Sequence, residues 1–459
     1  MWICLYIKKH YHIERVEKMI GIYMFFTALL LLAVGYPVAF SFGAISILFG
    51  FIAAFIEIFP SGGTLVEVGE EFFSMFSMMP FRIYSTMTNK LLMAIPLFIF
   101  MGIVLEKSGL AARLLESMGT LFGKVRGGLA ISTVLVGSLL AASTGVVGAS
   151  VVAMGVISLP VMLKYGYCKK LSTGTICAAG TLGQIIPPSI ILIILSDVFG
   201  QPAGDMFKAA IIPSAILVGA YIVYILVITN LKKDLAPIIE APISDHAIRD
   251  AIFAIIPPLL LVLVVLGSIF AGIATPTESA SVGSVGAIIL AIIYKSFNWK
   301  LLEDAALETV KVTAMVIAIL IGATAFSMVF VYTGADALVE EFMLGLPGEK
   351  WGFLILSMVV IMLLGFFIDF FEISYIVVPI LIPIANTIGI DPIWFAILIA
   401  MNLQTSFLTP PFGFSLFYLK GVAHKVKTID IYKGVVPFIL IQIAVLASII
   451  IFPEVYGFG

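Results

Sequence analysis

The sequence predicts an all-α, polytopic membrane protein built from two inverted repeats, each with a re-entrant hairpin and a broken helix. Three observations predict it: the composition, two related Pro-Pro pairs, and an exchange of charge between corresponding loops. Of the 459 residues, 61% are hydrophobic and only 11% are charged, whereas about 25% of an average soluble domain is charged. Apolar stretches near the ~20 residues that cross a bilayer recur along the chain, which predicts about ten to twelve membrane elements.

The composition also excludes several functions. A net charge of −2 without a basic patch argues against a nucleic-acid partner. The three cysteines show no paired spacing, so neither a disulfide framework nor a zinc site is expected. No long polar segment is present, so a receptor, ATPase or catalytic domain would have to be another polypeptide. Residues 1–19 are expected to be an N-terminal tail, because they are basic and aromatic and show no signal-peptide cleavage site.

An internal repeat is visible in the spacing of prolines and glycines. GQIIPPSI (183–190) and QTSFLTPPFG (404–413) both place a Pro-Pro pair inside an apolar span. Other positions share the offset between these pairs: Pro160 with Pro383, and Gly166 with Gly389. Such matches indicate two copies of one unit, roughly 20–231 and 250–455.

Charge indicates that the two copies are inverted. The loop KYGYCKK (164–170) is basic, whereas its counterpart TIGID (387–391) carries no positive charge. The pattern then reverses, because GQPAGD (200–205) lacks Lys and Arg while KGVAHKVK (420–427) is basic. Basic loops favour the cytoplasmic side, so corresponding loops lie on opposite faces. Inverted repeats are typical of secondary transporters, which bind their substrate near the membrane midplane.

The two Pro-Pro pairs predict helix breaks with a function. In hydrocarbon, a helix breaks only where its freed backbone groups meet protein, water or a ligand. Proline removes a donor and disrupts the preceding turn, so carbonyls at 180–184 and 403–407 are expected to be freed. With nearby hydroxyls they would form a neutral oxygen shell that suits sodium. A third pair, Pro257-Pro258, has no polar cluster around it and predicts a helix start.

A hairpin is expected before each break. The intervals 128–164 and 351–386 are too short for two full spans of ~20 residues and a turn. The first carries small and hydroxyl residues in AASTGVVGASVVAMG (141–155), and the second carries Asp369 and Glu372. An intramembrane acid is a functional candidate, although both acids could instead be solvated at the hairpin tip. The small and hydroxyl residues could equally serve helix packing alone.

The remaining segments predict supporting structure. Charge on one side of 66–84 and 300–312 indicates interfacial arm helices, and ATPTES (274–279) indicates a loop with Glu278 as a further candidate residue. The expected division is therefore: tail 1–19; first scaffold and arm helices 20–90; first transport region 91–231, with a hairpin at about 128–165 and a broken helix at about 171–199; linker, second scaffold and arm helices 232–312; second transport region 313–459, with a hairpin at about 351–386 and a broken helix at about 392–420.

Four motifs in order, AASTGVVGASVVAMG, GTLGQIIPPSI, ATPTES and NLQTSFLTPPFGFSLFYLKG, resemble the large membrane subunit of tripartite ATP-independent periplasmic (TRAP) transporters, the DctM-like family. The resemblance runs from about residue 20 to the end. It implies an elevator-type fold of the ion-transporter superfamily, a bacterial inner-membrane location and no enzyme activity. It also implies uptake of small organic acids, such as a C4-dicarboxylate or keto acid, with two or more sodium ions. The expected partners are a small four-helix membrane subunit, a periplasmic substrate-binding protein and the lipid bilayer.

The resemblance also implies site residues. A first sodium site would comprise Ser143, Thr144, Gly145, Ser150, Gly180 and Gly183. A second would comprise Asp369, Thr405 and Ser406, although the Phe residues around Asp369 depart from its small-residue counterpart. The substrate would be bound near the breaks by Thr181, Gln184, Pro187, Asn402, Gln404, Thr409 and Pro410.

Three alternatives stay open from the sequence. A stand-alone sodium-coupled carboxylate carrier of the same superfamily would transport without a binding protein. An intramembrane enzyme would use Asp369 and Glu372 as paired acids, but would leave the acid-free first break unexplained. A passive channel would give no reason for hairpins paired with breaks.

The cation assignment predicts that Ser150→Ala and Ser406→Ala each raise the sodium concentration needed for half-maximal uptake, because each removes an oxygen ligand. Uptake measured against sodium concentration, with expression level as the control, tests this. Unchanged sodium dependence in both variants would contradict the assignment.

Overall fold

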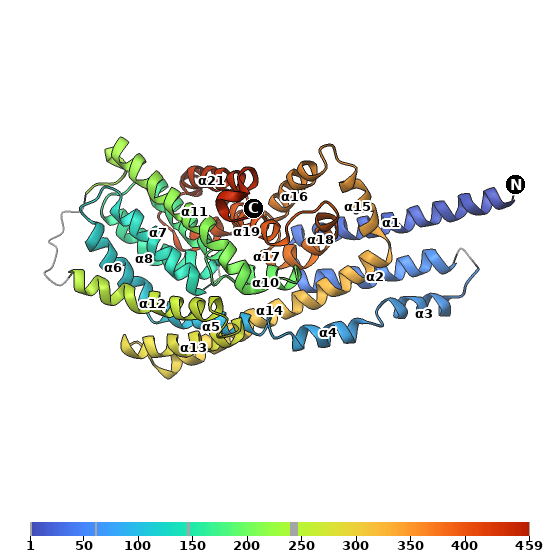
Figure 1. Cartoon of the computed structure of the whole chain (residues 1–459), viewed down its shortest axis with the longest axis horizontal. Coiled ribbons are helices and arrows are strands. Elements are labelled where there is room, and N and C mark those ends of the chain that lie inside the picture. The colour runs from blue at the N-terminus through green and yellow to red at the C-terminus, as the bar shows by residue number, and fades with distance from the viewer. Residues whose placement is uncertain (1, 60–61, 145–146, 239–246, 459) are drawn as a thin grey trace. The chain divides into compact units, whose positions relative to one another are not determined.

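The computed structural model describes residues 2–59, 62–144, 147–238 and 247–458, and their regular secondary structure is entirely helical (Figure 1). This confirms the predicted all-α class. The chain forms two compact units. Unit 1 comprises Met1–Asn89, Ala314–Val360 and Phe367–Asp391, and unit 2 comprises Lys90–Thr313, Ile361–Phe366 and Pro392–Gly459.

Unit 1 is built from helices at the start of the chain and from the later segments that return to it. Its elements are α1 (Trp2–Val34), α2 (Val38–Ile58), α3 (Leu65–Met75), α4 (Met79–Thr88), the second half of α14 (Trp299–Tyr332), α15 (Ala335–Leu344), most of α16 (Lys350–Leu364), α17 (Phe370–Glu372), the π-helix η4 (Ile373–Val377) and α18 (Val378–Thr387). α1 begins at Trp2, so the expected tail is continuous with the first apolar helix.

Aromatic side chains and one glycine join the helices of unit 1. Phe326 of α14 packs edge-on against Phe42 of α2, with ring centroids 5.0 Å apart, and also contacts Phe25 of α1. A Cβ on Gly322 would lie 2.7 Å from the Ala39 carbonyl oxygen, so α14 and α2 approach closely. α3 is amphipathic and buries Val68 and Met75 against Ala53 and Ala54 of α2.

Unit 2 contains the first hairpin and both breaks. Its elements are α5 (Ala94–Lys107), α6 (Leu110–Phe122), α7 (Gly128–Thr144), α8 (Val147–Lys164), α9 (Lys169–Thr181), η2 (Leu182–Gln184), α10 (Ile190–Val198), α11 (Ala203–Leu231), η3 (Lys233–Leu235), α12 (Ala247–Phe270), α13 (Pro276–Ile293), the first half of α14, α19 (Pro392–Leu408), α20 (Phe414–Val422), α21 (Thr428–Ile451) and η5 (Pro453–Tyr456).

The broken helices form the core of unit 2. Every residue from Leu171 to Thr181 in α9, from Ile190 to Ser196 in α10, and from Trp394 to Leu408 in α19 is buried. A helix that is buried on all faces belongs to the interior of a large protein. The surrounding helices α11 and α21 instead alternate buried and exposed faces, as expected where one face meets lipid.

Two glycines allow α21 to lie against α9. A Cβ on Gly174 would overlap the Gly434 backbone, and a Cβ on Gly434 would overlap the Lys170 carbonyl oxygen. Small residues that let backbones approach in this way drive helix association in membranes. α21 also packs on α11 through Phe438 and Tyr221, whose ring centroids lie 5.2 Å apart. α9 and α21, which are distant in sequence, are thereby held together.

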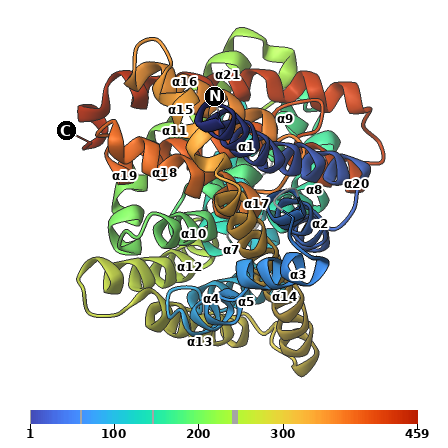
Figure 2. The ribbon, with the colours of Figure 1, turned by 90° about the vertical axis from the view of Figure 1, so that its right-hand side faces the viewer.

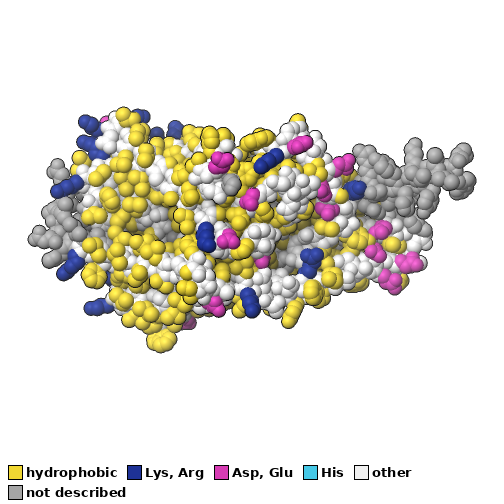
Figure 3. Space-filling model, viewed as in Figure 1, with side chains coloured by type: hydrophobic (Ala, Val, Ile, Leu, Met, Phe, Trp, Pro, Cys, Tyr) yellow, Lys and Arg dark blue, Asp and Glu magenta, His cyan; other side chains and the backbone are white. Residues whose placement is uncertain are grey.

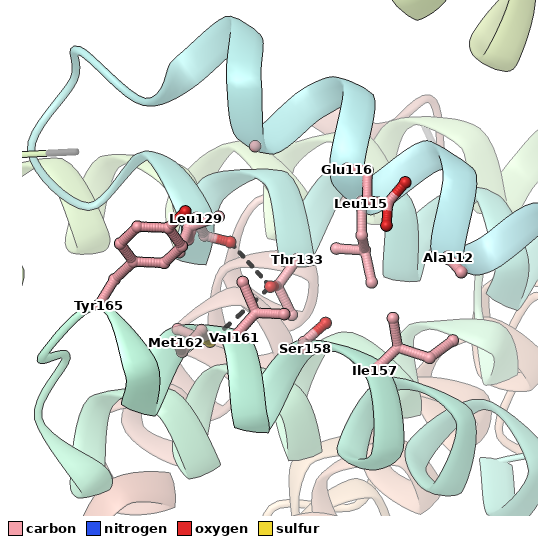
Figure 4. A pocket seen from close by; sticks show the side chains of 11 residues that line it. Ala112, Leu115, Glu116, Leu129, Thr133, Ile157, Ser158, Val161, Met162 and Tyr165 are labelled. Atoms are coloured by element: carbon pink, nitrogen blue, oxygen red, sulfur yellow. Dashed lines mark hydrogen bonds between the residues drawn. The ribbon is translucent and has the colours of Figure 1, made fainter. Parts of the chain in front are cut away.

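α7 and α8 form an antiparallel pair of 17 and 18 residues. Thr133, near the start of α7, donates a hydrogen bond to the Met162 sulfur near the end of α8 (3.9 Å; Figure 4). Gly137 of α7 meets Ala179 of α9, so the pair lies against the first broken helix. α20 lies beside the other helix, α8 (Figure 2).

Membrane-length helices are frequent. Among the described residues, eight helices are long and apolar enough to cross a membrane, or nine if the bent pair α5–α6 forms one span. Four shorter apolar helices accompany them, including one in α16 and one in α19. These helices confirm the polytopic class predicted from composition.

Three local predictions were wrong. Pro257 and Pro258 lie inside α12 rather than at its start, which membrane helices tolerate because neighbouring groups satisfy the freed carbonyls. Residues 300–312 form no separate arm, because α14 continues through them without a break. Glu278 is not in a loop: its carboxylate accepts from the Thr275 N–H (2.8 Å) in a capping box that begins α13.

Gly174→Ala is expected to destabilise the protein by about 1–3 kcal/mol, because the new methyl group must separate α9 from α21. Thermal unfolding of the purified protein measures the effect. Gly219→Ala in α11 is the matched control, since a Cβ there meets nothing within 4 Å, and it should be neutral or stabilising by up to ~1 kcal/mol. Equal melting temperatures for Gly174→Ala and the control would contradict the close packing.

Candidate functional site

The first break lies between α9 and α10. α9 ends at Thr181, η2 adds one tighter turn, and the Pro187–Pro188 peptide is cis before α10 begins at Ile190. The Ser189 hydroxyl donates to the Gln184 carbonyl (2.7 Å) across the break. A carbonyl at the end of the helix, which would otherwise lack a hydrogen-bond partner, is thus satisfied by a side chain from the next segment.

The second break lies between α19 and α20 and is closed in the same way. Pro410–Pro411 is cis, and α20 begins at Phe414. The Ser415 hydroxyl donates to the Phe407 carbonyl (2.9 Å). Gln184 and Phe407 are related by the same offset as the two Pro-Pro pairs. Corresponding carbonyls of the two breaks therefore each accept a hydrogen bond from a serine beyond the break.

Two buried amides lack partners beside these breaks. The side chains of Gln184 in η2 and Gln404 in α19 are fully buried, and neither their amide nitrogens nor their oxygens make a hydrogen bond. α19 packs against η2, so the two glutamines belong to contacting elements. An unpaired buried amide costs about 1–3 kcal/mol, so such groups indicate a water, ion or ligand that satisfies them.

The hydroxyl oxygens near the breaks are free to accept a further hydrogen bond or to coordinate a cation. Thr181 donates to the Ala178 carbonyl (2.9 Å), Thr405 to Met401 (2.9 Å) and Ser406 to Leu403 (2.7 Å). A hydroxyl that has donated its only proton keeps its oxygen lone pairs for another partner. These three positions therefore offer uncharged oxygen acceptors, which hard cations bind together with carbonyl and carboxylate oxygens.

The start of α8 approaches the end of α9. A Cβ on Gly180 would overlap the Val151 side chain and lie 3.2 Å from the Val151 backbone nitrogen. Ser150 is buried in the same turn of α8, and Gly183 is buried in η2. The structure therefore brings the regions of Ser150, Gly180 and Gly183 together. Ser143 and Thr144 end α7, and Gly145 lies outside the described residues.

Tyr418 also lies against this helix start. A Cβ on Gly148 would lie 2.9 Å from the Tyr418 ring, and one on Gly155 would meet Leu419 and Val422. α20, the second half of the second broken helix, is therefore packed along α8. The sequence reasoning missed Ser189, Ser415 and Tyr418. Ser189 directly follows the first Pro-Pro pair and Ser415 lies four residues after the second, which was an available signal, whereas Tyr418 had none.

The predicted second cation site is divided between the units. In unit 2, Gly365 follows α16 and lies so close to Ser406 that a Cβ on it would overlap the serine oxygen. Asp369 belongs to unit 1, where it caps α17 by accepting from the Phe370 N–H (2.7 Å). Its assignment to one site with Thr405 and Ser406 stays a prediction.

The other predicted substrate residues also lie at the second break. Asn402 is buried in α19, while Thr409 donates to the Thr405 carbonyl (2.7 Å). The first break contributes the N-terminus of α10 and the second that of α20, and neither has a side-chain cap. Uncapped N–H groups at helix starts favour anions. The breaks therefore supply amides, hydroxyls and helix N-termini, a set that suits a carboxylate and a cation together.

A separate cavity of about 210 Å³ lies between α6 and the open end of the α7–α8 pair (Figure 4). Glu116 lines it with a carboxylate, and Thr133, Ser158 and Tyr165 line it with hydroxyl groups. None of the predicted site residues lines it. No group of three or more His, Cys, Asp or Glu that could hold a metal occurs within the described ranges.

The chain matches a known family along nearly its whole length. The model of the family described as "Tripartite ATP-independent periplasmic transporter, DctM component" matches residues 25–455. The C4-dicarboxylate TRAP transporter large permease protein of Vibrio cholerae is 31% identical over 439 residues, covering 91% of this chain and 92% of that one. The corresponding protein of Pseudomonas aeruginosa is 31% identical over 376 residues, or 82% and 87%.

A longer relative and a solved structure are also similar. The isethionate TRAP transporter permease protein DctMQ of Oleidesulfovibrio alaskensis is 32% identical over 358 residues, which cover 77% of this chain but only 56% of that protein. The crystal structure of the Alcanivorax borkumensis YdaH transporter aligns with a TM-score of 0.60 at 15% identity, over 84% of this chain and 90% of that one. At this identity the likeness shows the fold alone.

Gln404→Met is expected to leave the melting temperature unchanged or higher, because it removes an unpaired buried amide while keeping a similar volume. It should nevertheless abolish the stabilisation that a bound organic acid and sodium confer. Thermal shift with and without these ligands measures both effects. Gln442→Met on α21, another buried unpartnered amide outside the breaks, is the control and should retain the ligand effect. Loss of the ligand effect in both variants would contradict a site role for Gln404.

Proposed function

The chain belongs to the DctM-component family of TRAP transporters, and we propose that it is the large membrane subunit that carries small organic acids inward together with sodium ions. Its membrane-length helices and its permease relatives indicate a multi-pass protein of the inner membrane, not an enzyme. The relatives are named for C4-dicarboxylates and isethionate. The proposed substrates share their chemistry, which is a compact organic anion.

The observation that supports substrate binding best is the pair of unpartnered amides at the breaks. Gln184 and Gln404 can each donate from Nε2 to a carboxylate oxygen and accept at Oε1. The uncapped starts of α10 and α20 add backbone N–H donors. A carboxylate bound there would satisfy groups that are otherwise buried without partners.

The residues at the two breaks also give a physical reason for sodium coupling. An unpaired carboxylate in a buried site is costly, and the described part of unit 2 offers amides and hydroxyls at the breaks rather than basic side chains. Sodium on the hydroxyls of Thr181, Thr405 and Ser406 would balance the substrate charge. Each net positive charge that enters gains about 2.3 kcal/mol per 100 mV, so two sodium ions with a monovalent acid, or three with a divalent acid, would support accumulation.

We expect the α7–α8 pair and the broken helices to move as one body in an elevator cycle. Gly174 and Gly434 join α9 to α21, Gly180 meets α8, and Gly148 meets Tyr418 of α20. Such close backbone contacts make relative sliding of these helices costly. The site would therefore travel intact, while its exposure to the two sides changes.

The proposed partners are a small four-helix membrane subunit and a periplasmic substrate-binding protein. The family description names one component of a tripartite transporter, which supports this. The match to the isethionate permease covers 56% of that protein's length, which supports a transporter built from further parts. A stand-alone carrier is the alternative that the experiment below distinguishes.

Uptake into proteoliposomes tests the proposal. This chain, the small subunit and the binding protein encoded with it would be assayed with labelled organic acids, with and without an inward sodium gradient. We expect sodium-driven uptake that disappears when the binding protein is omitted.

Uptake by this chain alone would instead establish a stand-alone carrier. Uptake that is independent of sodium, at unchanged membrane potential, would contradict the coupling. No uptake of any organic anion by the complete assembly, confirmed as folded by its melting curve, would contradict the substrate class.

A further inference from the structure

A long apolar groove runs along one side of unit 2. It encloses about 780 Å³, within the ~300–1,000 Å³ of ligand pockets. Its walls come from α6, α7, α11 and α12, and Ile186 and Pro187 of the first break also line it. The helices α11 and α12 that flank it are both long and apolar enough to cross a membrane.

The groove offers nothing to a polar ligand. Its lining side chains are apolar apart from Ser138 and Ser214. Both hydroxyls donate within their own helices, to Leu135 (2.8 Å) and Ile211 (2.9 Å). Among the residues that the structure describes, no charged side chain lines the groove. Its occupant should therefore be a flexible apolar chain rather than the transported anion.

Open space is present at two glycines in the wall. A Cβ added to Gly219 of α11 or to Gly267 of α12 meets nothing within 4 Å. Other helical glycines of unit 2, such as Gly174 and Gly434, permit close backbone contact. At Gly219 and Gly267 the missing side chains instead leave room in the groove.

One end of the groove is basic. α11 and α12 are antiparallel, since Lys208 near the start of α11 lies over the Phe270 ring at the end of α12 (5.9 Å). The opposite helix ends carry Lys124, Arg126, Arg249, Lys232 and Lys233, with the acids Asp234 and Asp250. Arg126 donates to the Lys233 carbonyl (3.5 Å). Figure 3 shows Lys and Arg gathered along the left-hand edge, beside a hydrophobic face.

Helix geometry matches the groove to one lipid leaflet. Its α11 wall runs from Ile211 to Ile222 and its α12 wall from Ile255 to Phe270, about 16 and 22 Å at 1.5 Å per residue. The hydrocarbon of one leaflet is about 15 Å thick, so the groove is long enough for an acyl chain of one leaflet. Arg249 precedes the first α12 lining residue, Ile255, by about 9 Å along the helix. That gap leaves room for a glycerol backbone, and Lys and Arg side chains are long enough to reach across it.

The basic loop 164–170 lies at the same end of the groove. It is joined to η3 by a hydrogen bond that the Cys168 N–H donates to the Leu235 carbonyl (2.9 Å). Because basic loops favour the cytoplasmic side, this end faces the anionic cytoplasmic leaflet.

We propose that the groove holds an acyl chain of an anionic phospholipid, whose phosphate lies among Lys124, Arg126 and Arg249. The chain would cover the apolar walls and fill the space at Gly219 and Gly267. Because Ile186 and Pro187 line the groove, it would also contact the first break from the side away from the buried Gln184. This inference is independent of which substrate is transported.

Native mass spectrometry of the purified protein tests the proposal, with phosphatidylglycerol and phosphatidylcholine of identical acyl chains as probes. The wild type should retain phosphatidylglycerol preferentially. Gly219→Leu fills the groove and should abolish this retention. Gly421→Leu on α20 is the matched control, since its Cβ also meets nothing within 4 Å and it does not line the groove.

A charge variant tests the headgroup site. Lys124→Gln/Arg249→Gln should weaken phosphatidylglycerol binding roughly tenfold or more and leave phosphatidylcholine unaffected. Lys300→Gln/Lys311→Gln removes the same charge from exposed positions of α14, which does not line the groove, and should have no effect. Equal retention of the two lipids by the wild type, or retention unchanged by Gly219→Leu, would overturn the proposal. A helix of the small subunit that cross-links within the groove would also overturn it, by naming another occupant.

Discussion

Everything in unit 2 depends on one constraint, which is that a helix broken inside an apolar interior must have its freed backbone groups satisfied by other parts of the protein. α9 and α19 are buried on every face, so water does not solve the problem for them. The solution at both breaks is a serine hydroxyl from beyond the Pro-Pro pair, on the carbonyls of Gln184 and Phe407. With the backbone satisfied in this way, the side-chain amides of Gln184 and Gln404 remain without a hydrogen-bond partner beside the breaks. Other buried side chains of unit 2, such as Gln442 and Thr175, also lack partners, but the two glutamines are the buried amides that lie at the place where a ligand is expected.

Glycine has two opposite uses in this fold. At Gly174, Gly180 and Gly434 it removes side chains so that backbones touch, which joins the first hairpin, the first broken helix and α21. At Gly219 and Gly267 it removes side chains and nothing takes their place. The first use packs the helices around the breaks closely together, and the second leaves a groove along one side of unit 2. The polar site and the apolar groove then approach the first break from different directions, one through Gln184 and the other through Pro187.

Sequence patterns recovered much of the architecture but erred where local signals compete with context. Both Pro-Pro pairs at 187 and 410 end helices, whereas the pair at 257 lies inside α12. The chemistry of the three pairs is identical, so proline alone could not distinguish them; the polar residues near the first two pairs were the useful signal. ATPTES was taken for a loop although it is the capping box of α13. The amphipathic stretch at 300–312 continues into α14 because nothing in it ends a helix.

The sequence by itself determined the membrane class, the helical content, the positions of the two breaks and the family, because composition, proline and motif order act locally and survive without tertiary context. Only the tertiary structure decided which groups meet. The closure of Gln184 by Ser189, the cover of Gly148 by Tyr418 and the contact of Gly174 with Gly434 join segments through packing that no sequence period encodes. The same holds for the groove, whose walls come from four helices that are separate in the chain. Local chemistry sets where a helix can break, and packing between distant segments sets what the break can bind.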